Sequence, residues 1–243
     1  MTSRPNWQST DYASISPVFA ATAAASERAA FIRNTYLHMA GAIFAFIVLE
    51  LIYFTLFRTQ IESAVVWLQD IRWGWLLVLG GFIGVSWIAE SWARGSDSRG
   101  MQYAGLGLYV LAESVIFAPL LFIANHFFEG AITSAALMTL IITVGLSLVV
   151  YVSRVDFSFM RMFLYFGGLA ALSLIVASLV VGFHMGVWFP LAMVVLAGGY
   201  ILYQTSNILH HYRTDQYVAA ALSLFAAVAL LFWYLLQLFM RRD

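Results

Sequence analysis

Seven long stretches of mainly apolar residues follow one another along this chain, separated by short polar segments. They cover residues 35–57, 73–93, 102–124, 131–152, 160–182, 188–208 and 217–239. A helix needs about 20 apolar residues to cross roughly 30 Å of hydrocarbon. Because no connecting segment is long enough to hold a second domain, the pattern predicts an all-α membrane protein that folds as one bundle of seven transmembrane helices.

The segment before the first stretch has a different character. Residues 1–25 lack the basic start and apolar core of a secretory signal peptide. We expect residues 1–25 to form a flexible tail and residues 26–243 to form the single membrane domain.

The segment between the first two stretches is also patterned. Its apolar residues recur at helical spacing, at Ile61, Ala64, Val65, Leu68 and Ile71. This spacing favours a short amphipathic helix lying on the membrane surface, with an ordinary polar loop as the alternative. Trp67, Trp73 and Trp75 would then lie at the depth of the lipid headgroups.

The basic residues predict which way the bundle crosses the membrane. All 12 are arginines, and more of them fall on the face of the N-terminus than on the other face. The first face carries Arg4, Arg28, Arg33, Arg94, Arg99, Arg154, Arg161 and Arg213, and the second carries Arg58, Arg72, Arg241 and Arg242. Since cytoplasmic segments carry the excess of positive charge, we expect the N-terminus inside and the C-terminus outside.

Composition excludes several classes of function. The 12 acidic and 12 basic residues cancel, so there is no basic surface for nucleic acid. The absence of cysteine excludes disulfides and thiolate sites. The absence of lysine excludes a retinal Schiff base. No HExxH or GxSxG motif is present, so the sequence predicts no catalytic residue, cofactor or metal site, and we expect no enzyme.

Three glutamates lie inside apolar stretches, where a charge is costly. Glu50 falls in the outer half of the first stretch and Glu90 at the inner end of the second. Glu90 and Arg94 are four residues apart, which is the spacing of a structural ion pair on a helix.

Glu113, at the middle of the third stretch, is followed by Pro119, which leaves the carbonyl of Val115 without its helical partner. Glu113 and Val115 point about 200° apart on a helix, so they need not share a pocket. One interpretation is a carboxyl hydrogen-bonded inside the bundle, and the other is a station for a proton or a cation. The second would form a polar pathway from Glu113, Val115 and Pro119 to the inner mouth at Glu90, Arg94, Gln204 and Asn207.

Two further patterns leave alternatives open. The glycines at 80 and 84, 167 and 168, and 198 and 199 favour close packing inside the bundle, with a dimer face as the alternative. A haem iron between His38 and His210 would make the protein a haem carrier, although His210 and His211 point about 100° apart and cannot easily share one metal ion.

Two segments, FIRNTYLHMAGAIFAF (31–46) and YILYQTSNILHHYRTDQYVAAALSLFAAVALLFWYLLQLF (200–239), resemble the Bax inhibitor family. The TSNI-x-H run is most similar to its bacterial inner-membrane branch. The resemblance implies a seven-helix bundle with the last helix near its centre. Family members are described as pH-sensitive calcium leak channels with two aspartates, on the sixth and seventh helices, as the latch. A bacterial branch associates instead with a membrane-bound ATP-dependent protease.

This sequence departs from that pattern at the latch, because the two positions carry Gln204 and Ala227. Neither side chain titrates near neutral pH. We therefore expect a non-catalytic accessory or regulatory subunit of a membrane complex in the bacterial inner membrane, with the lipid bilayer and a membrane protein, such as a protease, as partners. The alternative is a leak channel for a cation or proton with an altered latch.

Overall fold

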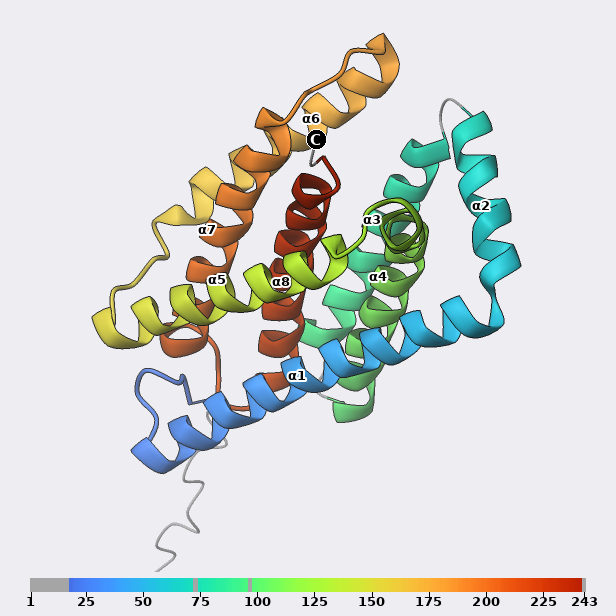
Figure 1. Ribbon diagram of the computed structural model, residues 1–243. Coiled ribbons are helices and arrows are strands. Elements are labelled where there is room, and N and C mark those ends of the chain that lie inside the picture. Colours follow the sequence, from blue (N-terminus) through green and yellow to red (C-terminus); the bar gives the residue numbers. More distant parts are fainter. Residues whose placement is uncertain (1–17, 72–73, 96–97, 242–243) are drawn as a thin grey trace, which may run out of the picture.

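The computed structural model describes residues 18–71, 74–95 and 98–241, and eight helices account for most of them (Figure 1). The helices are α1 (Ala25–Leu56), α2 (Arg58–Asp70), α3 (Gly74–Gly95), α4 (Arg99–Phe127), α5 (Ala131–Ser153), α6 (Met160–Val181), α7 (Trp188–His210) and α8 (Tyr217–Phe239). All except α2 are long and apolar enough to cross a membrane. The fold class and the seven spans predicted from the sequence are confirmed, with most of the predicted ends within three residues of the observed ones.

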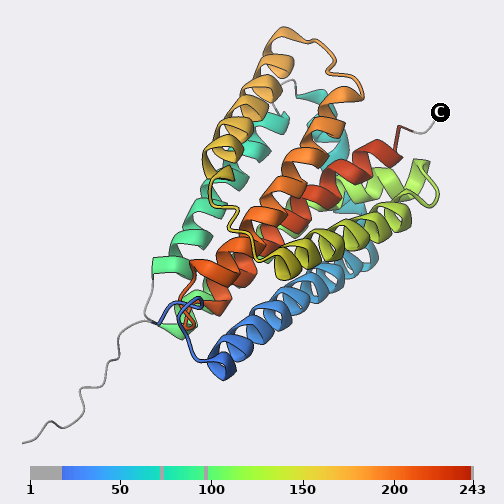
Figure 2. The same ribbon diagram turned by 90° about the vertical axis from the view of Figure 1, so that its left-hand side faces the viewer.

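The last helix, α8, lies at the centre of the bundle (Figures 1 and 2). It packs against α1, α3, α4, α5 and α7. Three consecutive alanines near its start, Ala219, Ala220 and Ala221, are buried. Small residues let membrane helices approach closely, which is the main source of their attraction in lipid. The central position implied by the family resemblance is therefore confirmed.

The second most buried span is α4, which packs most closely against α3. A Cβ atom at Gly105 of α4 would lie 2.5 Å from the Ala89 carbonyl oxygen and 2.9 Å from the Ala93 nitrogen of α3. Both neighbours are backbone atoms of a regular helix and cannot move aside cheaply. Glycine at position 105 is therefore what allows α3 and α4 to touch.

The short helix α2 confirms the amphipathic helix expected between the first two spans, and the polar-loop alternative is wrong. Its buried residues Ile61 and Leu68 recur at helical spacing, and Ile61 packs against Ala118 and Phe122 of α4. Trp67 is exposed. Arg72 and Trp73 lie outside the described residues.

The chain is fastened before the start of α1. The Ala20 amide donates to the Tyr212 carbonyl at 2.9 Å, and the Thr214 amide donates to the Val18 carbonyl at 3.0 Å. Residues 18–24, which we assigned to the flexible tail, are therefore attached to the loop between α7 and α8. Residues 1–17 lie outside the described part of the chain, so the tail remains an expectation only there.

An odd number of crossings places the start of α1 and the end of α8 on opposite sides of the membrane, as Figure 1 shows for the two ends of the bundle. Which side is cytoplasmic stays a prediction from the arginine distribution. Arg4, Arg72 and Arg242, which contributed to it, lie outside the described residues.

The glycine pairs divide into two kinds. A Cβ at Gly167 or Gly199 would meet side chains of the neighbouring span, Leu196 and Leu164 respectively, so these glycines pack α6 against α7 as predicted. Gly80 and Gly84 of α3 are exposed, and no described atom lies within 4 Å of a Cβ built at either. The prediction that this pair packs inside the bundle is wrong, because α3 turns that face away from its neighbours.

Candidate functional site

The structure places Glu113 inside the bundle, at the middle of α4, with 6% of its surface exposed. Tyr109, one turn earlier on the same helix, is its hydrogen-bonding neighbour. The Tyr109 ring packs against Phe82 of α3 and Phe225 of α8, with centroid distances of 6.0 and 6.1 Å. The carboxyl therefore faces the junction of α3, α4 and α8 and not the lipid.

A second polar group lies at the inner end of α3. Arg94 lies 3.7 Å from Glu90, as the spacing predicts, and its Nη2 donates to the Ser223 hydroxyl of α8 at 2.8 Å. The Ser223 hydroxyl also lies 2.9 Å from the Tyr212 hydroxyl. Arg94 thus ties α3 to the central helix.

Tyr109 lies between the two groups, near Glu90 of α3 as well as Glu113, but the buried Ser86 hydroxyl has no hydrogen-bond partner among the described residues. Polar side chains therefore follow one another from the C-terminal end of α3 to the middle of the bundle. Sequence reasoning found Glu90, Arg94 and Glu113 because they carry charges, but it missed Tyr109 and Ser223. Tyr109 and Glu113 are four residues apart, a spacing at which side chains meet on a helix, so this neighbour could have been found from the sequence. Arg94 and Ser223 are 129 positions apart, and nothing in the sequence indicates their contact.

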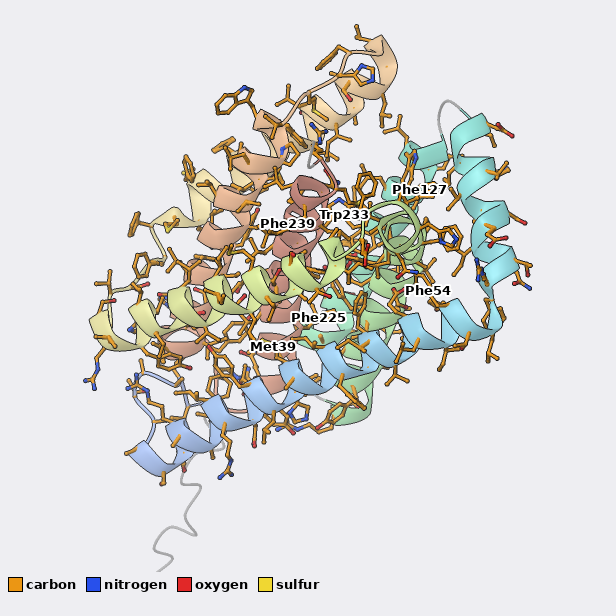
Figure 3. All side chains as sticks on the ribbon, in the orientation of Figure 1. Met39, Phe54, Phe127, Phe225, Trp233 and Phe239 are labelled. Atoms are coloured by element: carbon orange, nitrogen blue, oxygen red, sulfur yellow. The ribbon has the colours of Figure 1, made fainter. Side chains whose placement is uncertain are left out.

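The polar line ends at an aromatic cluster. Phe117, one turn beyond Glu113, is buried, and its ring stacks on Phe232 at 5.6 Å and meets the edge of Trp233 at 4.9 Å. Phe46 of α1 packs on it from a third side at 5.2 Å. Figure 3 shows Trp233 among the side chains at the outer end of α8. These rings fill the centre of the bundle on the outer side of Glu113.

The remaining residues of the predicted pathway are not brought together with Glu113. The Val115 side chain is 60% exposed, so it lies on a different face of α4. Pro119 is buried, and α4 continues through it. Gln204 and Asn207 lie on α7, where the side-chain amide of Asn207 donates from Nδ2 to the side-chain Oε1 of Gln204 at 3.4 Å. The Arg94 network reaches α8 instead of these two residues.

The two latch positions carry no titratable pair. Ala227 is buried on α8, and neither α7 nor α8 contains an aspartate or a glutamate. Across the described ranges, no group of three or more histidine, aspartate or glutamate residues is placed to hold a metal ion.

The histidines at the inner face make local contacts. Both ring nitrogens of His38 are engaged, with the Asn34 carbonyl at 2.7 Å and the Tyr103 hydroxyl at 2.9 Å, which leaves none for an iron. His211 lies 3.0 Å from Asp156 in the loop between α5 and α6. Partial desolvation alone would raise the pKa of Asp156. Hydrogen bonds from Ser158 and His211 have the larger combined effect, so the pKa lies below its usual value.

The third glutamate, Glu50 of α1, is buried as deeply as Glu113, with 7% of its surface exposed. Neither of its carboxyl oxygens has a hydrogen-bond partner among the described residues. It lines a cavity of about 800 Å³ between α1 and α5. The sequence identified Glu50 as a charged residue inside an apolar stretch, but nothing in the sequence indicated that its carboxyl group would lack a partner.

Comparison with known proteins agrees with the fold. An uncharacterised protein of Pseudomonas aeruginosa is 35% identical over 113 residues, which cover 45% of this chain and 50% of that protein. The matched region is thus about half of either chain. No solved structure matches. The family model described as inhibitor of apoptosis-promoting Bax1 matches residues 28–243, which is nearly the whole described bundle, and the chain therefore belongs to this Bax inhibitor-like family of membrane proteins.

Proposed function

We propose that this protein is a non-catalytic subunit that binds another membrane protein and regulates or steadies it. The observation that carries the proposal is the outward face of α3. Gly80 and Gly84 lie there with no described atom within 4 Å of the added Cβ, and Trp87, 77% exposed, lies one turn further on. Two small residues four apart let a second helix approach the backbone closely.

The closed centre of the bundle supports the same function. The aromatic cluster of Phe46, Phe117, Phe232 and Trp233 fills the space on the outer side of Glu113. Gln204 and Ala227 cannot act as a proton-operated latch. A bundle with these features fits a binding role better than conduction.

The partner follows from the family resemblance stated for the sequence. The bacterial branch associates with a membrane-bound ATP-dependent protease, and we propose a protein of that kind, in the bacterial inner membrane, as the partner of α3.

Purification in mild detergent tests this function. We expect the wild-type chain to carry a stoichiometric membrane partner, and the double variant Gly80→Leu/Gly84→Leu to lose it. Gly145→Leu on α5 is the matched control, because it also adds a side chain at an exposed glycine with open space around it. A wild-type protein that always runs alone, or equal loss in the control, would overturn the proposal.

A leak pathway for a proton or cation is the second candidate function, and one observation favours it. The polar side chains of Arg94, Glu90, Tyr109 and Glu113 follow one another from the C-terminal end of α3 to the middle of α4. We would expect Glu113→Gln to change proton or calcium flux into liposomes if this line conducts. An unchanged flux removes the reason for this function.

A further inference from the structure

A cavity of about 800 Å³ has walls that come from α1, α4, α5 and α8. Figure 1 shows α1 and α5 passing in front of α8, and Figure 3 shows Met39 and Phe225 between them. Its rim includes exposed Leu51 of α1 and Leu148 of α5. The cavity therefore opens sideways, toward the lipid.

The wall is apolar except at a few points, and four of these, Tyr36, Glu50, Thr143 and Tyr151, lack hydrogen-bond partners among the described residues. Neither carboxyl oxygen of Glu50 on α1 has a hydrogen-bond partner in the described structure, and neither does the hydroxyl of Thr143 on α5. Both side chains are more than nine-tenths buried. Buried polar groups in lipid-embedded proteins are almost always satisfied, because an unpaired one is costly. Unpaired groups on both facing walls, α1 and α5, therefore indicate a missing ligand.

Two other polar side chains on the α5 wall are satisfied within the protein. Thr139 donates to the Ala135 carbonyl at 2.7 Å, and Ser147 lies 3.5 Å from the Thr205 hydroxyl. Thr143 lies between them, one turn from each, and its hydroxyl has no partner among the described residues. Thr139 and Ser147 thus have partners within the protein, whereas Thr143, which shares the cavity with Glu50, does not.

The chemistry of these groups defines the ligand. A carboxyl group accepts a hydrogen bond in either protonation state, and a threonine hydroxyl can donate or accept. A head group with an O–H or N–H donor can therefore satisfy the carboxyl of Glu50 in either protonation state. The rest of the wall, including Met39, Ile43 and Phe46, requires an apolar body. A volume of this size matches sites for molecules of drug or single-chain lipid size.

At the other end of the same cavity, Tyr36 of α1 and Tyr151 of α5 face each other with ring centroids 6.2 Å apart, and neither hydroxyl has a hydrogen-bond partner among the described residues. Thr143 and Tyr151 are eight residues apart on α5, which is about 12 Å along the helix. An alkyl chain that begins at Glu50 and Thr143 would run along the apolar wall toward these rings.

We propose that the cavity between α1 and α5 binds one single-chain amphiphile from the membrane, held by a hydroxyl or amine head that donates to Glu50. The site is separate from the Gly80–Gly84 face, since α3 contributes nothing to the cavity wall. It is also independent of the proposed partner, so either can fail without the other.

Native mass spectrometry of the full chain in detergent tests the site with three defined probes. These are 1-hexadecanol, hexadecylamine and hexadecyl methyl ether, which share one chain length but differ in whether the head can donate. We expect one molecule of the alcohol or amine to bind about tenfold more tightly than the ether, which is the effect of one good hydrogen bond. Stronger binding of the alcohol or of the amine identifies the head group.

Variants of the chain complete the test. Glu50→Leu should abolish the preference for the donor, and Thr143→Val, which keeps the side-chain shape, should weaken it. Ala136→Trp, at an exposed position on the wall, should reduce binding of all three probes by filling the space. Glu113→Gln, outside the cavity, should change nothing.

Equal binding of alcohol, amine and ether by the wild-type chain would overturn the proposal, because the cavity would then be a gap filled by any lipid chain. A preference that persists in both Glu50→Leu and Thr143→Val would overturn it as well. So would a dimer in which a second copy of the chain occupies the space between α1 and α5, shown by cysteine cross-linking from Ile47 to the partner copy.

Discussion

Glu113 of α4 and Glu50 of α1 are buried to the same extent, with 6% and 7% of their surfaces exposed, yet their surroundings differ. Glu113 has Tyr109 beside it and belongs to a polar line that reaches Arg94. Glu50 faces a cavity and has no described partner. A buried charge in a membrane helix therefore has no single meaning. A buried carboxyl group that has partners within the protein stabilises the bundle. A buried carboxyl group without a partner indicates a ligand from outside the protein.

Phe117 separates the two carboxyl groups, because it lies one turn after Glu113 and also lines the cavity that holds Glu50. Phe117→Ala should give the largest loss of stability, about 3 kcal/mol or more, since three aromatic rings lose their contacts and an empty space remains. SDS unfolding of bicelle-reconstituted protein measures it. Phe163→Ala on the exposed face of α6 is the control. An equal loss in both variants would show that Phe117 is not a central packing residue.

Glu113→Leu should cost about 1–3 kcal/mol, because the buried Tyr109 hydroxyl loses its neighbouring carboxyl. The same unfolding measurement applies. Tyr109→Phe removes the other half of the pair, so the double variant should cost less than the sum of the two single ones. Additive losses would show that the two side chains are not coupled.

Glu50→Leu should change the free energy of unfolding in the opposite direction to Glu113→Leu. It removes an unpaired buried carboxyl, so the ligand-free protein should gain about 1 kcal/mol of unfolding free energy. Added 1-hexadecanol should stabilise the wild type and not the variant, because a ligand stabilises only the state that binds it. If Glu50→Leu loses as much stability as Glu113→Leu, the contrast between the two glutamates is wrong.

The smallest effect concerns a carboxyl at the surface. A hydrogen bond from Arg213 holds the pKa of Asp215 below its usual value. Its stabilisation is therefore complete above the usual pKa of about 4 and is lost as pH falls through the lower folded value. Thermal unfolding in detergent at pH 7 and pH 3 should show a smaller pH effect in Asp215→Asn than in the wild type. Because Asp215 is distant in sequence from both buried glutamates, Glu50→Leu and Glu113→Leu should leave this difference unchanged. An unchanged pH effect in Asp215→Asn would contradict the role of this ion pair.

Much of the candidate site could be found from charge alone. Glu90, Arg94 and Glu113 stand out in apolar stretches, and the structure connects all three. Gln204 and Asn207 also stood out as polar, but they bond to each other on α7. The sequence could not separate these cases, because a polar residue near a helix end is consistent with either a network or a local contact.

The sequence by itself determined the seven crossings, the amphipathic helix α2 and the absence of a carboxyl latch, because these depend on apolar length, on helical period and on residue type. Only the tertiary structure decided that Gly80 and Gly84 face outward while Gly105 touches α3, and that Glu50 is left without a partner. The physical reason is that length and period act within one helix, whereas the rotation of a helix about its axis is set by how its neighbours pack.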